Sequence, residues 1–155
     1  MKPQRYKVWH KKQKRWMGEL AILSQIGEVI LLSPKTDGLE MEYITDDVYI
    51  MQSTGLTDKN KKDIFCGDIV SIDRMIHKIR ADDSLETKKV GSSVGEIQWK
   101  DGHGFLIKII KSTGESFNPS LYFIDALTGG VESKQIKYCE IIGNIYQDEH
   151  LLSTK

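Results

Sequence analysis

The chain contains 155 residues, and its 22 basic and 22 acidic side chains give a formal net charge of zero. A chain of this length buries enough surface to form an apolar core without staples, as one domain or two small subdomains. The balanced charge excludes attraction of the whole molecule to nucleic acid or anionic lipid, so any such binding requires a local patch.

Cysteine usage and hydropathy bound the cellular setting. Cys66 and Cys139 lack metal-ligand spacing and the density of a disulfide scaffold, which favours a reducing cytoplasm, although pairing between them stays open. No apolar run of signal-peptide length follows the basic N-terminus, and no stretch is long enough to span a bilayer. We therefore expect a soluble cytoplasmic protein without a membrane partner.

A β-hairpin is predicted at the start of the chain. Residues 5–10 and 15–17 contain aromatic and β-branched residues and flank a polar turn, with Tyr6, Val8 and Trp16 available to the inner side. Strands of this length joined by a short polar turn are typical of a hairpin.

A second strand pair is predicted over residues 21–23 and 28–32. The following residues 33–47 carry many acids and turn-forming residues, and they predict an acidic connecting loop of low order. This loop is the candidate internal boundary. We therefore predict an N-terminal β-hairpin region with an acidic loop over residues 1–47, and a β-barrel with a C-terminal tail over residues 48–155.

Strand signals are stronger beyond the acidic stretch. β-Branched and aromatic residues concentrate in residues 48–52, 64–65 and 69–72, with an extension of the last segment toward Ile79. Turn-forming residues separate these segments, which predicts a series of short antiparallel strands.

A further hairpin is predicted around the sequence Lys100-Asp101-Gly102-His103-Gly104. Glycine permits the positive φ that a tight reversal needs. On one side of the turn Ile97 and Trp99 share a face, and on the other side Phe105 and Ile107 do so together with Ile109. This alternation is what a half-buried antiparallel ladder requires.

Residues 121–127 fit two structures. Asn118 and Gly129 would flank a helix over this segment, whereas its aromatic and branched residues also fit a strand. Periodicity leaves the two alternatives open. Closer to the C-terminus, residues 135–142 predict a strand and residues 148–152 predict a closing helical turn.

One block of the sequence carries a family likeness. Residues 51–70 read MQSTGLTDKNKKDIFCGDIV, and three further pieces follow the same family order: YKVW at residues 6–9, GEIQWKDG at 95–102 and IIGNIY at 141–146. Together they resemble the YopX family over nearly the whole chain. The chain departs from the family pattern at Ser53, Lys61 and Cys66, where the family usually has an aromatic residue, a glycine and an acidic residue.

The resemblance implies an all-β fold related to SH3-type barrels, carried by phages and prophages of bacteria, with no established activity and no catalytic residues to transfer. We therefore expect a small SH3-like β-barrel with an N-terminal β-hairpin region and at most one or two short helices. The expected location is the cytoplasm of the bacterial host cell.

Several residues have structural tasks in this interpretation. Gly67 supplies unusual backbone angles, Asp68 accepts bonds from neighbouring loop amides, and Ile69 or Val70 enters the core. The predicted structural motif consists of Thr54, Gly55, Gly67, Asp68, Ile69, Gly143 and Asn144.

The N-terminal hairpin is the candidate nucleic-acid surface, because basic groups release counterions from phosphates and aromatic rings stack on unpaired bases. The alternative is a lysine-rich edge hairpin whose charges discourage aggregation and whose tryptophans pack inward. The candidate residues are Lys7, Trp9, Lys11, Lys12, Lys14, Arg15 and Trp16.

The acidic stretch between Lys35 and Lys59 has three interpretations: a contact for the basic arm of a neighbouring subunit, a cation site, or a solvated loop. A calcium loop around Asp58 is excluded because the required glycine and terminal glutamate are missing. The acids of this stretch are Asp37, Glu40, Glu42, Asp46, Asp47 and Asp58.

No catalytic or metal-binding motif is predicted. The four histidines are scattered, and His103 in the Gly102-His103-Gly104 turn is the one worth testing. We expect no enzyme activity, metal, cofactor or small-molecule substrate. The predicted function is a non-enzymatic protein-interaction or self-assembly module with an unidentified protein partner or a second copy; nucleic-acid binding through the basic hairpin is the alternative.

Overall fold

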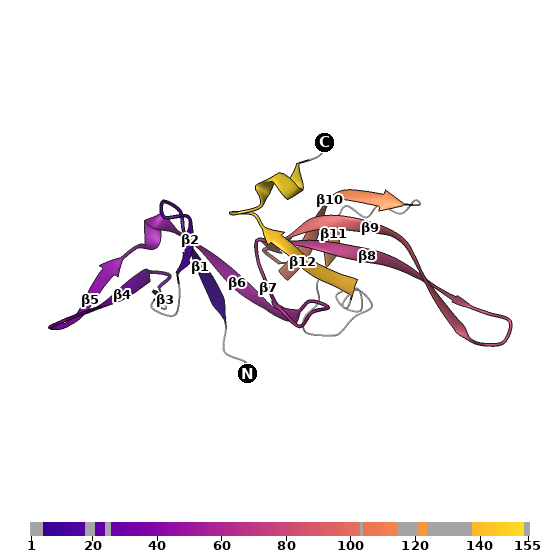
Figure 1. Ribbon diagram of the computed structural model, residues 1–155, viewed down its shortest axis with the longest axis horizontal. Coiled ribbons are helices and arrows are strands. Elements are labelled where there is room, and N and C mark those ends of the chain that lie inside the picture. Colours follow the sequence, from indigo (N-terminus) through magenta and orange to yellow (C-terminus); the bar gives the residue numbers. More distant parts are fainter. Residues whose placement is uncertain are drawn as a thin grey trace. The chain divides into compact units, whose positions relative to one another are not determined.

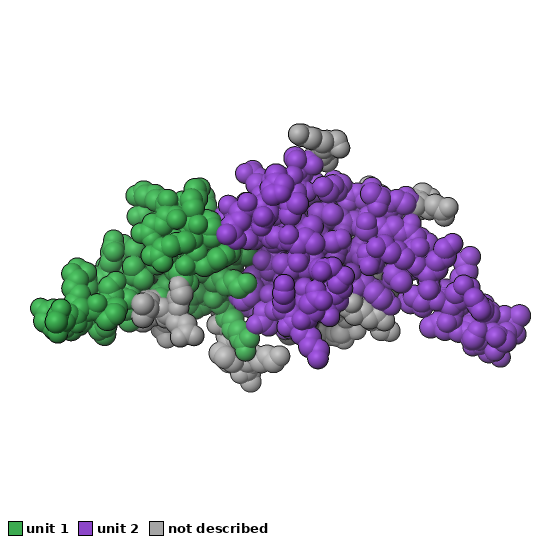
Figure 2. All heavy atoms as spheres, in the orientation of Figure 1, with its two compact units in different colours: residues 1, 3–52 green, residues 2, 53–155 purple. Residues whose placement is uncertain are grey.

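The computed structural model describes residues 5–17, 21–23, 26–102, 104–114, 121–123 and 138–153. The described residues form strands and two short 3₁₀ helices, which confirms the predicted all-β class (Figure 1). The chain divides into two compact units, residues 1 and 3–52 and residues 2 and 53–155 (Figure 2). Among the described residues, no helix has the length and apolar character needed to cross a membrane.

The first unit contains the predicted N-terminal hairpin. Strand β1 (Tyr6–His10) pairs with β2 (Arg15–Met17) and, on its other edge, with the first half of β6 (Val48–Thr57). β1 is therefore a central strand, and its residues Val8, Trp9 and His10 are all buried. Three consecutive buried residues break the expected alternation, so Trp9 lies inside rather than outside.

The first unit also contains a three-stranded antiparallel sheet made of β3 (Ala21–Leu23), β4 (Val29–Lys35) and β5 (Gly38–Tyr43). The 3₁₀ helix η1 (Thr45–Asp47) follows β5. The prediction of a low-order loop over residues 33–47 is therefore wrong. The physical reason is that the apolar residues of β5 alternate and lie directly opposite apolar residues of β4, as a hairpin requires.

Pro34 is compatible with its position in β4. The amide of Ile44 donates to the carbonyl of Val29, so hydrogen-bonded pairs alternate from there along the hairpin and the Pro34–Leu39 pair is non-hydrogen-bonded. A proline at this position removes no bond between β4 and β5. The core of this unit is formed by Val8, Met17, Ala21, Val29, Ile44 and Val48.

The second unit is built on a five-stranded antiparallel sheet with the order β11-β10-β9-β8-β12. The second half of β6 pairs with the short strand β7 (Asp63–Phe65). The sheet strands are β8 (Asp68–Ile79), β9 (Leu85–Lys100), β10 (Gly104–Gly114), β11 (Leu121–Phe123) and β12 (Cys139–Asn144), and the 3₁₀ helix η3 spans Glu149–Leu152.

The observed strands agree with most of the predicted ones. β8 reaches Ile79, and the hairpin around Asp101 and Gly102 joins β9 to β10. β9 begins at Leu85, whereas the sequence predicts a strand only from Glu96 to Trp99. The earlier part was not predicted because the polar residues before Val94 carry no apolar alternation. Residues 121–123 are a strand, and residues 124–127 lie outside the described residues. Of the predicted strand 135–142, residues 135–137 also lie outside them, and residues 139–142 belong to β12.

The sheet of the second unit is curled (Figure 1). Register shifts interrupt the β8–β9, β9–β10 and β8–β12 ladders, and bulges of this kind bend a strand and increase its twist. The curled sheet encloses a core that includes Val70, Ile97 and Ile107, and Ile69 is fully buried as well. The predicted shared apolar interior is therefore confirmed, while the relation to SH3-type barrels stays a prediction.

Candidate interaction surfaces

The tryptophans of the basic hairpin form an edge-to-face pair. The ring centroids of Trp9 and Trp16 are 4.9 Å apart at an interplanar angle of 67°. Trp9 is only 2% exposed, whereas Trp16 is half-buried. Lys7 Nζ lies 5.8 Å from the centroid of the Trp16 ring. The ring that reaches the surface next to a cation is therefore that of Trp16.

Two of the candidate lysines face acidic or polar groups of η1. Lys12 Nζ lies 2.8 Å from Asp47 Oδ1, and Lys11 Nζ donates to the carbonyl of Asp46 at 2.8 Å. The hydrogen bond between Lys12 and Asp47 raises the pKa of the lysine and lowers that of the carboxyl group. Lys11 also lies over the Tyr49 ring, 4.6 Å from its centroid. The acidic stretch thus interrupts the basic surface.

The exposed basic groups of this hairpin are fewer than the sequence alone indicates. Lys7, Lys12, Lys14 and Arg15 are exposed, and Lys11 is half-buried. Lys14 has a φ of 52°, which places it in the left-handed region within the turn. A residue in this region is typical of a tight reversal, so Lys14 has a structural role besides its charge.

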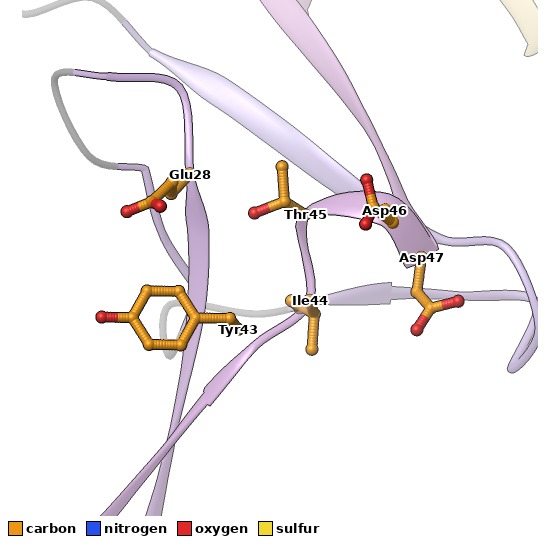
Figure 3. Close-up of a pocket in the computed structure, with 6 residues that line it drawn as sticks. All are labelled: Glu28, Tyr43, Ile44, Thr45, Asp46 and Asp47. Atoms are coloured by element: carbon orange, nitrogen blue, oxygen red, sulfur yellow. The ribbon is translucent and has the colours of Figure 1, made fainter.

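A pocket of about 370 Å³ opens beside η1 (Figure 3). Glu28, Tyr43, Ile44, Thr45, Asp46 and Asp47 line it. The Glu28 carboxylate and the Tyr43 ring project to the same side in Figure 3, and Thr45 Oγ1 accepts a bond from the amide of Val29 at 3.0 Å. Carboxylates beside an aromatic ring are suited to a basic side chain rather than to an apolar substrate.

The β4–β5 hairpin presents an apolar face to solvent. Leu39, Met41 and Tyr43 alternate along β5 and are 68%, 65% and 65% exposed. They lie opposite Pro34, Leu32 and Ile30 in non-hydrogen-bonded pairs, where side chains are closest. Every residue of β5 is exposed, including Glu40 and Glu42 on the opposite face. This face was not predicted, although the alternation of Leu39, Met41 and Tyr43 is a signal for it in the sequence.

Residues of the predicted structural motif in the second unit form hydrogen bonds with neighbouring strands and turns. Thr54 is buried, and its Oγ1 donates to the carbonyl of Ile64 at 2.9 Å. Asp68 Oδ2 accepts a bond from the amide of Phe65 at 2.8 Å. Gly67 has a φ of 91°, and its amide donates to the carbonyl of Ile97 at 2.7 Å. Gly55 likewise has a positive φ, and Ile69 is fully buried.

Near the C-terminus, Asn144 organises the turn that follows β12. Its Oδ1 accepts bonds from the amides of Tyr146 and Gln147 at 3.0 and 3.1 Å. Gly143 is required by space, since an added Cβ would lie 2.7 Å from a carboxylate oxygen of Asp148. Both residues therefore serve local structure.

Asp58 is an organising residue that sequence analysis assigned to a surface stretch. Its Oδ1 accepts the amides of Asn60 and Lys62 at 2.8 and 2.9 Å, and its Oδ2 accepts the amide of Ile141 at 3.1 Å. Burial opposes the ionised form, but these backbone bonds outweigh it and lower the pKa of Asp58. The partner at position 141 gives no signal in the local sequence.

The cysteines and histidines form no cluster in the described residues. Cys66 and Cys139 are free thiols; burial raises the pKa of both, and that of Cys139 reaches about 12. A buried thiol with so high a pKa is a poor nucleophile. Groups of histidine, cysteine or acidic residues suitable for a metal ion are not found in the parts of the chain that the structure describes, and His103 lies outside them.

Known proteins with the same fold are found by family and structure comparison. The model of the YopX protein family matches residues 5–153. Protein EF1440 from Enterococcus faecalis is 20% identical with a TM-score of 0.51, over 97% of this chain and 98% of that one. Protein yopX from Bacillus subtilis is 21% identical with a TM-score of 0.52, over 99% and 100% of the two chains. The comparison with curated proteins gives no match.

Proposed function

Because the chain belongs to the YopX family, we propose that its curled β-fold serves as a non-enzymatic protein-interaction module, with the β4–β5 hairpin as its contact surface. The observation that carries the proposal is the apolar face of this hairpin, on which Leu39, Met41 and Tyr43 are mostly exposed. Clustered exposed apolar side chains on a polar rim are typical of interaction sites.

The energetics of the hairpin support the same proposal. Beyond Leu31, where the pairing with β3 ends, β4 and β5 form a two-stranded hairpin, and such a hairpin is marginally stable in water unless it packs one face against another element. β5 buries none of its residues within this chain, so its strand geometry is maintained mainly by β4. A bound polypeptide would cover the apolar side chains and stabilise the hairpin, which gives binding a favourable hydrophobic contribution.

The proposal includes a cellular location and a kind of partner. The resemblance to phage and prophage proteins points to the cytoplasm of a bacterial host cell, where the partner would be another protein of the host or phage, or a second copy of this chain. Catalysis has no part in it.

Site-specific photo-crosslinking tests the proposal. A photoreactive amino acid replaces Met41 in the full chain, which is produced in the bacterium that naturally carries the gene. We expect covalent adducts to protein at position 41 and none at Lys108, an exposed residue of β10 that serves as the matched control. Absence of adducts at both Met41 and Leu39 would refute the β4–β5 surface.

Nucleic-acid binding is the second candidate, favoured by the half-buried Trp16 ring with Lys7 over it. The burial of Trp9 and the pairing of Lys12 with Asp47 count against it. Fluorescence anisotropy with labelled single-stranded DNA and RNA tests this candidate. Nucleic-acid binding predicts a salt-sensitive affinity that is lost when Lys7, Lys14 and Arg15 are replaced by glutamate. An absence of binding at low ionic strength would eliminate this candidate.

A further inference from the structure

Each unit has strand edges that no other strand covers within the described part of the chain, among them β5 in the first unit and the outer part of β8 in the second. β5 is the last strand in the order β3-β4-β5. In the second unit, β12 pairs with β8 only as far as Ile72, so the outer part of β8 beyond this residue has β9 on one side alone. Uncovered edges present amide and carbonyl groups that can pair with another strand.

The β5 edge presents its backbone groups at apolar residues. Ile44 and Val29 form a hydrogen-bonded pair, and such pairs alternate along an antiparallel ladder. The amides and carbonyls of Leu39, Met41 and Tyr43 therefore point away from β4. Their side chains lie on the apolar face, whereas Glu40 and Glu42 lie on the other face.

The outer edge of β8 has the matching pattern. The amide of Arg80 donates to the carbonyl of Ser84, so the non-hydrogen-bonded pairs with β9 include Ile79–Leu85 and His77–Thr87. The backbone groups of Met75, His77 and Ile79 therefore point outward. Ile79 is 77% exposed, and the exposed Lys78 lies on the opposite face of the strand.

We propose that the occupant of the β5 edge is a second copy of this chain, which adds the outer part of its β8 as an antiparallel strand. This inference rests on the proposed function and names its partner. The pairing joins outward backbone groups to outward backbone groups, as strand addition requires. In the register that aligns three such pairs, Leu39 lies opposite Ile79, Met41 opposite His77 and Tyr43 opposite Met75.

Side chains on both faces fit this register. On one face, Leu39 meets Ile79, so two of the most exposed apolar side chains of the molecule cover each other. On the other face, Lys78 lies directly opposite Glu40 and diagonally to Glu42, distances at which cross-strand charges attract. A shift of one residue would set the outward backbone groups of β5 against residues of β8 whose amides and carbonyls point to β9, so the alternation of backbone groups excludes it.

The same charges disfavour a symmetric pair of β5 strands. Antiparallel pairing of two copies about Met41 would place Glu40 opposite Glu42 of the other copy, and like charges directly opposite each other are destabilising. Pairing of β5 with β8 uses two different surfaces. Such a head-to-tail contact leaves one uncovered edge at each end of a pair of copies and extends to a ring or an open chain.

A charge-exchange experiment tests the inference by sedimentation velocity at high protein concentration and low salt. One variant carries E40K and E42K, and the other carries K78E and R80E. We expect the wild type to self-associate and each variant alone to be monomeric, because β5 and β8 then have the same sign. An equimolar mixture should associate again, since both contacts between unlike variants are complementary.

A matched control separates this contact from a general effect of charge. K108E with K111E changes the net charge as much as K78E with R80E does, on exposed residues of β10, and should leave self-association unchanged. Circular dichroism establishes that each variant is folded.

Two outcomes would overturn the inference: a monomeric wild type, or single variants that associate as the wild type does. If position 41 still crosslinks to another protein in cells, the proposed function survives and only the second copy as partner is wrong. Adducts between two copies of the chain at position 41 would support both the proposed function and the second copy as partner.

Discussion

The turn at Asp58 and strand β5 both come from the acidic stretch between Lys35 and Lys59, yet they behave in opposite ways. The Asp58 carboxylate is buried and accepts three backbone bonds, one of them from Ile141. In β5 every side chain is exposed, including Glu40 and Glu42. Asp58 holds distant segments of its own chain together, whereas Glu40 and Glu42 lie on an exposed strand, where Glu40 forms a surface ion pair with Lys35.

Burial and hydrogen bonding therefore separate the structural residues of this chain from its interaction residues. A buried carboxylate that satisfies several amides stabilises the fold, because its removal leaves those amides without partners. An exposed apolar row contributes little to the stability of an isolated copy. Stability measurements on the two regions should therefore diverge.

The largest effect is expected from D58A. Loss of three bonds to a charged group should lower the free energy of unfolding by about 3 kcal/mol or more. Urea denaturation measures this change, with D37A in the exposed β4–β5 turn as the control, for which we expect a change of less than about 0.5 kcal/mol. Equal effects of the two substitutions would remove the distinction between the regions.

The second prediction concerns the pH dependence of the unfolding free energy. Because the folded-state pKa of Asp58 lies below its ordinary value of 3.8, the ionised carboxylate contributes stability above that value. This contribution is lost as the pH falls through the lower folded-state pKa. The difference in unfolding free energy between wild type and D58N should therefore be full at neutral pH and shrink below about pH 4. A difference that stays constant down to pH 2 would contradict the assignment.

A smaller effect with the opposite sign is expected at Lys61, where the φ of 63° is in the left-handed region. K61G relieves the strain of a side chain in this region but increases the freedom of the unfolded chain. We expect a net stabilisation of about 0.5 to 1 kcal/mol, measured as an upward shift in Tm. K62G, two residues before the strand residue Ile64 and not among the residues with positive φ, should destabilise instead.

The smallest effect on stability is expected for L39S and M41S in dilute solution, where each should change the free energy of unfolding by less than about 0.5 kcal/mol. The same substitutions should abolish association, since they remove the exposed apolar face. Urea denaturation and sedimentation velocity on the same samples measure both properties. A large loss of stability in dilute solution would show that this face is covered within the single chain.

Much of the fold could be predicted from local sequence. The glycine at position 67, followed by Asp68 and two buried branched residues, correctly predicts a turn that feeds a core strand, because backbone angle, hydrogen bond and burial are all encoded within residues 65–70. The hairpin at Gly102 is encoded in the same local way.

Features that depend on distant partners could not be predicted. The role of Asp58 depends on an amide at position 141, and the burial of Trp9 depends on β6 covering the second edge of β1. β5 was missed for another reason. Its acids suggested a solvated loop, and the alternation of Leu39, Met41 and Tyr43 indicated a strand only when matched to Ile30, Leu32 and Pro34 of β4.

Pro34 gives the β4–β5 hairpin a direction. A proline has no amide proton, so the flank of β4 that points away from β5 cannot donate a bond at this residue. The flank of β5 carries no such block along Gly38–Tyr43. Recruitment of a strand is thereby biased to one side, a built-in polarity that guards against the two-sided stacking from which amyloid-like fibres grow.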